Sequence, residues 1–273
     1  MSKPTVVAGR NPVREALADD PARIEKLMLA RGARGHLEGP LERLRRAAKD
    51  VGVPVQVVPQ QALDRASGGA THQGAVALVA PVAYRDVDAL LSEIAPTLDE
   101  VKARAPLVLA LDGIEDPHNF GAILRSAVGA GAEAVIVTER GMAPLSAAAV
   151  KASAGAALRA PLARTSNLAG ALAAMKERGY WVVGLERAAA RAPEASGAAD
   201  ARATTVWDWD WSRATALVVG SEGRGLSGPV RKACDGLAEI PMRGDVESLN
   251  ASVATGIALF IAAKDRPAPT WGG

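Results

Sequence analysis

From Pro106 onward, short apolar runs alternate with segments of helical periodicity, and this alternation limits the folds open to the chain more than any other feature. In the segments between the runs, apolar residues recur every three or four positions, which is typical of a helix. The alternation predicts an α/β domain built on a mostly parallel sheet that helices cover. The expected strands are Leu107–Leu111, Ala134–Thr138, Trp181–Leu185, Thr215–Val219 and Ala238–Pro241. The expected helices are Phe120–Ala130, Leu145–Ala152, Leu168–Arg178, Pro229–Asp235 and Ala251–Lys264.

The first 80 residues predict a second, smaller α/β module. Asn11-Pro12 predicts a helix start, with Asn as the N-cap and Pro at the first helical position. Apolar residues at helical spacing predict a further helix over Leu37–Val51. The expected strands here are Ile24–Ala30, Val53–Val58 and Ala75–Ala80.

We therefore expect domains at residues 1–80 and 106–273, joined by residues 81–105. The join contains Pro81, Pro96 and an acidic, helix-prone stretch. The Ala-rich residues 188–203 lack a firm pattern and predict a surface loop.

Composition narrows the function classes. The net charge is +2, but residues 1–80 hold 12 Lys and Arg against 8 Asp and Glu. This excess of positive charge in the N-terminal part is compatible with a polyanionic partner, and it is equally compatible with an ordinary solvated surface. The single Cys234 excludes a disulfide framework within a monomer, and the three scattered histidines, His36, His72 and His118, argue against a metal site. With no apolar leader and no run of 18 apolar residues, we expect a cytoplasmic protein.

Three polar loops are the candidates for chemistry, because each follows an expected strand. They are Asp112–Arg125, Val218–Ser227 and Ile240–Gly256. Loops at the carboxyl ends of strands are where α/β proteins bind ligands and carry out reactions. The sequence therefore predicts one site to which the three loops contribute.

Each loop also has a purely structural interpretation. Asn119 is suited to cap a helix and Arg125 to be a surface charge, while Ser248 or Asn250 is suited to cap the last helix. The run Gly223–Gly228 matches the dinucleotide fingerprint G-x-G-x-x-G. We discount a dinucleotide site, because only 45 residues follow the run and the acids Asp245 and Glu247 lie in a loop and not at the end of a strand.

Taken in order, the three loops resemble the three motifs of SpoU-type (TrmH-like) RNA ribose 2′-O-methyltransferases of the SPOUT superfamily. The first is Asn119-x-Gly121-x3-Arg125, the second is Gly220–Leu226, and the third is Ile240-Pro241-Met242 with Ser248-Leu249-Asn250-x-Ser252-x-Ala254. The segments Gly9–Leu17 and Thr71–Val79 resemble the N-terminal module of the bacterial 23S rRNA guanosine 2′-O-methyltransferases. The resemblance covers nearly the whole chain.

The resemblance implies a catalytic domain with a deep trefoil knot and an L30-like N-terminal RNA-binding domain. It also implies a homodimer, S-adenosyl-L-methionine as the methyl donor, and a guanosine of 23S rRNA as the substrate. Ser221, where Asn or Ala is common, and the charged Arg243, Asp245 and Glu247 leave the substrate preference open. The implied catalytic residues are Asn119, Arg125, Glu222, Ser248 and Asn250. The implied cofactor-binding residues are Gly184, Leu185, Gly220, Ile240, Met242 and Leu249.

Methyl transfer to a ribose hydroxyl needs an aligned donor and a route for the hydroxyl proton. A guanidinium stays protonated in proteins, so we interpret Arg125 as a clamp on a phosphate or on the developing alkoxide. Ser248 or a water would relay the proton, and Glu222 and Asn250 would orient these groups. Two alternatives remain: the same reaction on tRNA or another rRNA loop, and a non-catalytic RNA-binding or ribosome-assembly factor.

Overall fold

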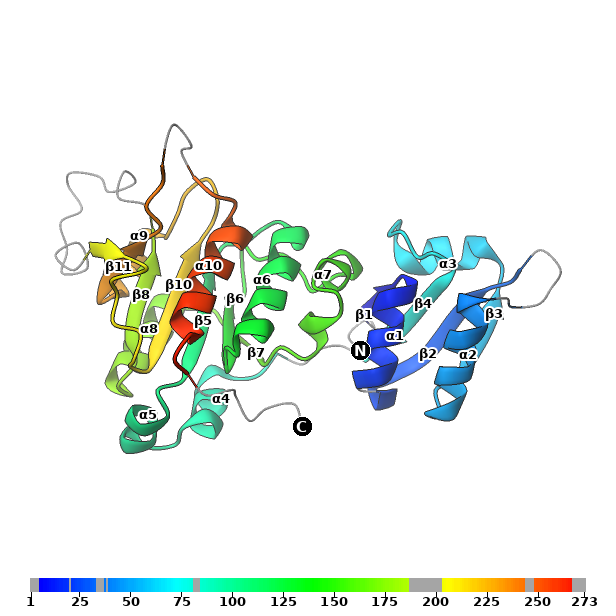
Figure 1. Cartoon of the computed structure of the whole chain (residues 1–273), viewed down its shortest axis with the longest axis horizontal. Coiled ribbons are helices and arrows are strands. Elements are labelled where there is room, and N and C mark those ends of the chain that lie inside the picture. The colour runs from blue at the N-terminus through cyan, green and yellow to red at the C-terminus, as the bar shows by residue number, and fades with distance from the viewer. Residues whose placement is uncertain are drawn as a thin grey trace. The chain divides into compact units, whose positions relative to one another are not determined.

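The computed structural model describes residues 5–19, 21–32, 37, 39–80, 84–186, 203–243 and 248–266 of the chain. The chain divides into two compact units, each with its own sheet (Figure 1). The first unit is Met1–Ala83 together with Pro144–Arg159, and the second is Tyr84–Ala143 together with Ala160–Gly273. Both units have the α/β class that the sequence predicts.

The first unit contains a four-stranded mixed sheet in the order β1-β4-β2-β3. Strand β4 runs antiparallel to β1 and β2, whereas β3 runs parallel to β2. The carboxyl ends of β1, β2 and β3 therefore share one edge with the amino end of β4. The strands are β1 (Thr5–Ala8), β2 (Ile24–Ala30), β3 (Val55–Val58) and β4 (Ala75–Val79).

Helices cover both faces of this sheet. Leu27 and Leu29 of β2 share a core with α1 and α2, while Met28 packs with Leu63 of α3 on the other face. This alternation is the two-residue period of a strand buried on both sides. The helices are α1 (Arg10–Asp19), the 3₁₀ turn η1 (Pro21–Arg23), α2 (Pro40–Asp50) and α3 (Gln60–Ser67).

The segment Pro144–Arg159 belongs to the first unit, although its neighbours in the sequence belong to the second. It contains α7 (Ala147–Ala152) and the 3₁₀ turn η2 (Ala156–Leu158). Val150 of α7 is fully buried in the first unit's core, and Arg23 Nη1 donates to the Leu158 carbonyl at 2.8 Å. The sequence predicts these residues to lie inside the domain 106–273, because local periodicity carries no information about which core a helix joins.

The second unit is a seven-stranded sheet in the order β7-β6-β5-β10-β8-β11-β9, and every neighbouring pair runs parallel. All its strands therefore end at the same edge. They are β5 (Leu107–Asp112), β6 (Ala134–Thr138), β7 (Leu162–Thr165), β8 (Trp181–Leu185), β9 (Ala203–Thr205), β10 (Thr215–Gly220) and β11 (Gly236–Glu239).

Two layers of helices cover this sheet. Val108 and Ala110 of β5 share a core with α4, α8 and α9, so the fully buried Leu107, Leu109 and Leu111 point to the other face. Helices α6 and α10 pack side by side there (Figure 1). The helices are α4 (Val87–Ile94), α5 (Leu98–Arg104), α6 (Pro117–Ala130), α8 (Leu168–Glu177), α9 (Gly228–Ala233) and α10 (Ala251–Ala263).

Residues 84–105, which the sequence analysis assigns to the join, form α4 and α5 and belong to the second unit. Asp86 caps α4, and Thr97 with Glu100 forms a capping box on α5. Four residues of α4 and Val101 of α5 enter the core of the second unit. The apolar residues of this helix-prone stretch therefore pack into the core of the second unit.

Three observed strands were not expected from the sequence: β1, β7 and β9. Each stands at the edge of its sheet and is three or four residues long. Residues 188–202 of the predicted loop lie outside the described residues, as do His36, Asp245 and Glu247, and Ala203 begins β9. No helix of the described segments is long and apolar enough to cross a membrane.

Candidate functional site

The three motifs converge at the carboxyl edge of the second unit's sheet. The first follows β5, the second follows β10, which lies beside β5, and the third follows β11 and leads into α10. Because α6 and α10 begin at this edge and pack on each other, their first turns lie close together. The convergence that the sequence predicts is therefore present.

At the centre of this edge, one carboxylate oxygen joins the three motifs. Glu222 Oε1 accepts hydrogen bonds from Asn119 Nδ2 at 2.7 Å and from Asn250 Nδ2 at 2.8 Å. Asn250 Nδ2 also donates to Asn119 Oδ1 at 2.9 Å, which closes a triangle of side chains. The backbone N–H of Ala251 donates to the same Glu222 oxygen at 3.2 Å. Free N–H groups and the positive end of the dipole at a helix N-terminus stabilise such a negative charge.

Helix caps decide which of these side chains are free for chemistry. Asp116 caps α6 by accepting from the His118 N–H at 3.0 Å, so Asn119 is not the cap and lies buried in the first turn. Asn250 does cap α10, because its Oδ1 accepts from the N–H of Ser252 at 2.9 Å. That bond fixes the orientation of the amide, so Asn250 Nδ2 faces Glu222. The capping interpretation is correct for Asn250 and compatible with its place in the triangle.

A tight loop brings Glu222 to this position. The backbones of Ser221 and Gly225 exchange two hydrogen bonds, with N to O distances of 3.1 and 2.9 Å. Gly225 has φ +64°, in the left-handed region. A Cβ on Gly220 would lie 2.2 Å from the backbone of Gly225, so the loop folds back only if residue 220 is glycine.

A cavity of about 470 Å³ lies against this loop. Five of the six residues expected to bind a cofactor line it, namely Leu185, Gly220, Ile240, Met242 and Leu249. Glu222 and Ser248 line it as well. The sixth, Gly184, is buried in strand β8, where an added Cβ would meet Leu226 at 2.7 Å and Leu237 at 2.8 Å. The close packing against those two side chains accounts for the glycine at that position.

Two ion pairs near the cavity were not expected from the sequence. Glu186, which lines the cavity, pairs with Arg231 of α9 at 2.7 Å, and both side chains are largely buried. Arg224 of the second motif pairs with Glu115 of the first at 3.1 Å beside a smaller cavity of about 320 Å³. Glu186 follows β8 directly, so its place after an expected strand is the signal that could have found it.

Arg125 is the one expected catalytic residue that neither lines one of these cavities nor contributes to the triangle. Its side chain is exposed on α6 and forms no hydrogen bond or ion pair with a described residue. It is free to meet an anion or a second chain.

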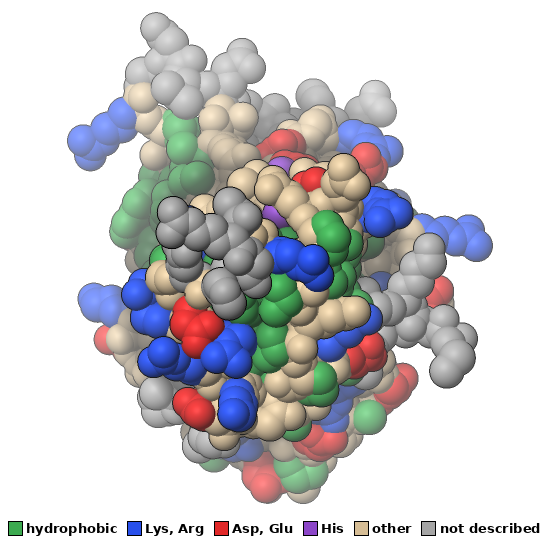
Figure 2. All heavy atoms as spheres, turned by 90° about the vertical axis from the view of Figure 1, so that its right-hand side faces the viewer, with side chains coloured by type: hydrophobic (Ala, Val, Ile, Leu, Met, Phe, Trp, Pro, Cys, Tyr) green, Lys and Arg blue, Asp and Glu red, His purple; other side chains and the backbone are tan. Residues whose placement is uncertain are grey.

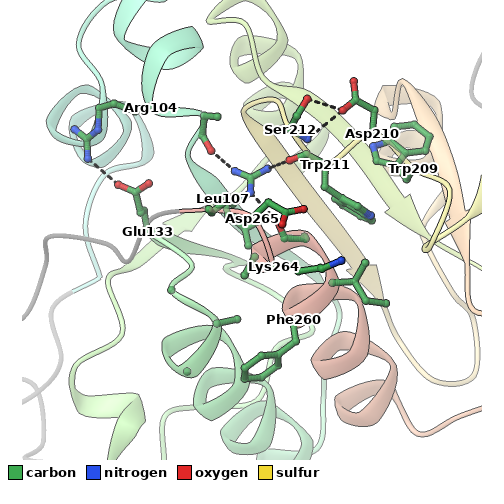
Figure 3. A pocket seen from close by; sticks show the side chains of 18 of the residues that line it. Arg104, Leu107, Glu133, Trp209, Asp210, Trp211, Ser212, Phe260, Lys264 and Asp265 are labelled. Atoms are coloured by element: carbon green, nitrogen blue, oxygen red, sulfur yellow. Dashed lines mark hydrogen bonds and ion pairs between the residues drawn. The ribbon is translucent and has the colours of Figure 1, made fainter.

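A larger cavity, about 1190 Å³, lies elsewhere (Figure 3). It is lined by the end of α10, the end of α5 and the start of β5, and so it lies toward the opposite edge of the sheet. Arg266 donates to the carbonyls of Ala105, Trp211 and Arg213 there, and burial lowers its pKa. These bonds tie the end of α10 to the sheet, so we assign this region a structural role. No His, Cys, Asp and Glu cluster suited to a metal occurs in the described part of the chain.

Comparison with known proteins agrees with this geometry. The model of the SpoU rRNA Methylase family matches residues 106–260, and the model for RNA 2′-O ribose methyltransferase substrate binding matches residues 6–85. A putative TrmH family tRNA/rRNA methyltransferase, YacO of Bacillus subtilis, is 39% identical over 254 residues, which cover 93% of each chain. The 23S rRNA (guanosine-2′-O-)-methyltransferase RlmB of Photobacterium profundum is 36% identical over 96% of this chain and 98% of its own.

A solved structure has the same fold. The SpoU methyltransferase AviRb from Streptomyces viridochromogenes, in complex with AdoMet, has a TM-score of 0.68 at 24% identity and covers 95% of this chain and 89% of its own. The chain therefore belongs to the SpoU rRNA methylase family of RNA 2′-O-ribose methyltransferases. The family, the α/β class and the N-terminal substrate-binding domain predicted from the sequence are confirmed.

Proposed function

We propose that the protein transfers a methyl group from S-adenosyl-L-methionine to the 2′-hydroxyl of a guanosine ribose in 23S rRNA. The observation that carries the proposal is the triangle of Asn119, Glu222 and Asn250, of which Glu222 lines the 470 Å³ cavity. The relative from Photobacterium profundum is named as a guanosine-2′-O-methyltransferase of 23S rRNA, which supports the choice of base and RNA.

The 470 Å³ cavity fits S-adenosylmethionine. Its volume lies in the range of roughly 300–1,000 Å³ that is usual for cofactor sites, and its walls combine apolar side chains with a few polar groups. The backbones of Leu185, Gly220, Ile240 and Leu249 would hold the cofactor, with Met242 against it. When bound, the cofactor would supply a methyl group on a sulfonium sulfur.

The residues around the cavity would position the ribose hydroxyl and remove its proton. Glu222 accepts three hydrogen bonds, so we propose that its carboxylate stays fixed and orients the ribose hydroxyl that accepts the methyl group. Ser248, which lines the cavity, would relay the proton directly or through a water. Arg125 would clamp a phosphate or the developing alkoxide, since its guanidinium remains charged.

We further propose that the protein acts as a homodimer through α6 and α10. Val253 and Phe260 on α10 are 48% and 55% exposed, and Phe260 lies against Gly129 of α6. Because Val253 and Phe260 are seven positions apart, they share one face of α10, and an exposed apolar face is typical of an interaction surface. Arg125 is exposed on α6 as well, so a second copy bound to these helices would bring Arg125 to a site between two chains.

Three other expectations remain part of this proposal. The domain of residues 106–273 would contain a deep trefoil knot around the cofactor. Residues 1–80 would bind the RNA, as part of the first unit. An rRNA substrate would also place the protein in the cytoplasm.

The decisive experiment is transfer of a tritiated methyl group to unmodified 23S rRNA and to unmodified tRNA, with mapping of the modified ribose. We expect one 2′-O-methylguanosine in 23S rRNA. Labelling of tRNA or of another rRNA loop would assign the enzyme a different substrate. Cofactor and RNA binding without any transfer would instead identify a non-catalytic RNA-binding factor.

A further inference from the structure

We propose that one edge of the first unit's sheet binds the substrate RNA through Arg10, Arg31 and Gln73, with His72 as a positioning residue. The inference rests on the proposed function only in that the substrate is RNA. It adds which surface of the first unit makes the contact and what each residue does there.

The topology of the sheet brings the three residues together. Arg10 follows β1, Arg31 follows β2, and Gln73 precedes β4, which lies between those two strands. The Ala30 N–H donates to the Gly74 carbonyl at 2.8 Å, and the Arg10 N–H donates to Gln73 Oε1 at 3.4 Å. Because β1 and β2 flank β4, the two arginine backbones are about 10 Å apart, which is two strand spacings.

The loop that carries Gln73 is held in an unfavourable backbone conformation. Gln73 has φ +50°, a left-handed value that residues other than glycine rarely adopt. The buried His72 fixes the loop: its Nδ1 accepts from the Gly74 N–H at 3.0 Å, and its Nε2 is 2.9 Å from Asp64 Oδ1. Such strain persists where the surroundings impose it, and it is concentrated at functional sites. In this loop, the strained backbone holds the exposed amide side chain of Gln73.

The charges at this edge differ from the paired charges on α2. The side chains of Arg10 and Arg31 are exposed, and neither forms an ion pair with a described carboxylate. On α2, by contrast, Arg45 and Arg46 both pair with Glu42, and hydrogen bonding by Arg45 lowers the pKa of that carboxyl to about 2. Figure 2 shows Asp and Glu side chains among the Lys and Arg on the face around α2. Arg10 and Arg31 thus present guanidinium groups that no described carboxylate neutralises.

The residue types at the edge fit the two kinds of contact that RNA offers. A guanidinium group binds phosphate through two parallel hydrogen bonds, which positions the RNA without reading its sequence. The amide of Gln73 has both donors and an acceptor, which suits a base edge or a ribose 2′-hydroxyl in a single-stranded loop. His72 touches no RNA in this arrangement and acts by holding Gln73 in place.

The first test measures the affinity of the full-length protein for an unmodified 23S rRNA transcript over a range of salt concentrations. In the double variant Arg10→Ala/Arg31→Ala, we expect affinity to fall at least about tenfold near 0.1 M salt. We expect the slope of log K against log salt to shrink by roughly 1.4–1.8, because each phosphate contact contributes about 0.7–0.9. The matched control, Arg45→Ala/Arg46→Ala on α2, removes two arginines that pair with Glu42 and should leave the slope unchanged. Equal slopes in the two double variants would overturn the proposal.

The second test separates the loop's function from its structure. Gln73→Gly relieves the left-handed strain, so the melting temperature should hold or rise while RNA affinity falls. Gln73→Asn tolerates the same backbone and retains an amide, so it should keep part of the affinity. Wild-type RNA affinity in Gln73→Gly would refute the role of this side chain. Failure of the wild-type protein to methylate RNA would count against the proposed function, whereas methylation with unchanged affinity in every edge variant would count against this inference alone.

Discussion

At the scale of single residues, the site depends on the crowded oxygen of Glu222. Three donors from two other motifs meet at Oε1, so the side chain is both a structural link and a fixed charge. These two roles can be separated, because glutamine has the same shape without the charge.

We expect Glu222→Gln to fold normally, since its amide oxygen can accept the same three hydrogen bonds. Its single-turnover methyl-transfer rate should fall about 10²-fold, the usual cost of removing one electrostatic contribution at a reacting centre. Glu222→Ala should in addition lower the free energy of unfolding by about 1–3 kcal/mol, because the buried Asn119 loses its acceptor. Equal rates for wild type and Glu222→Gln would show that the charge is not needed.

Arg125 differs from Glu222, because its side chain forms no hydrogen bond or ion pair with a described residue. We expect Arg125→Ala to lose at least about two orders of magnitude in rate, as on removal of a transition-state electrostatic contact. Folding and cofactor affinity should change little. Arg125→Lys should recover only part of the rate, since a point charge cannot reproduce bidentate geometry. The exposed helical cation Lys102 on α5 provides the control: if Arg125→Ala and Lys102→Ala are equally active, Arg125 is a surface charge.

At the scale of elements, the loop Ser221–Gly225 shows why motif glycines differ in importance. The fold-back leaves no space beside Gly220, whereas nothing lies within 4 Å of a Cβ placed on Gly223. The two glycines are close together in one motif, and only their surroundings distinguish them.

We therefore expect Gly220→Ala to destabilise the protein by about 3 kcal/mol or more, at the upper end of the usual cost of overpacking. Calorimetry should show loss of S-adenosylmethionine binding, because the fold-back of residues 221–225 lines the cavity and cannot form around a Cβ at position 220. Gly223 lines the same cavity, but a Cβ there leaves the fold-back intact, so Gly223→Ala should retain the melting temperature and most of the cofactor affinity. Similar thermal and calorimetric behaviour of the two variants would contradict the packing argument.

The three strands that the sequence did not predict share one property. Strands β1, β7 and β9 are short and lie at sheet edges, so each contributes too few residues for an alternating pattern to stand out. The central strands β5 and β10, with nearly every residue buried, were found as apolar runs. Prediction succeeded where burial on both faces imposes an apolar sequence, and failed where it does not.

At the scale of the whole molecule, the proposed homodimer is open to direct test. Light scattering at micromolar concentration should give about 56 kDa, twice the 28.0 kDa chain. Phe260→Asp should shift the protein toward monomer, since it places a charge in an apolar contact. Val51→Asp, at an exposed apolar residue of the first unit, should remain dimeric. A monomeric wild-type protein would end the dimer proposal.

The division of the chain into two units was predicted only in part. The sequence suggested two consecutive domains, but Pro144–Arg159 joins the first unit and residues 84–105 join the second. Removing residues 1–80 would therefore expose Val150, which the first unit's core buries, so a truncation of this kind is not a clean test of either unit.

The sequence by itself determined the family, the α/β class and the motif residues that meet in the triangle. It could do so because the apolar periodicity and the motifs are local, and each is readable within a short stretch of chain. The tertiary structure decided what depends on residues far apart in the chain: that Glu222 accepts from Asn119 and Asn250, and that Asp116 caps α6 in place of Asn119. It also decided that Gly184 packs inside the sheet and that Arg10, Arg31 and Gln73 share one edge. These outcomes follow from strand order and packing, which no local pattern encodes.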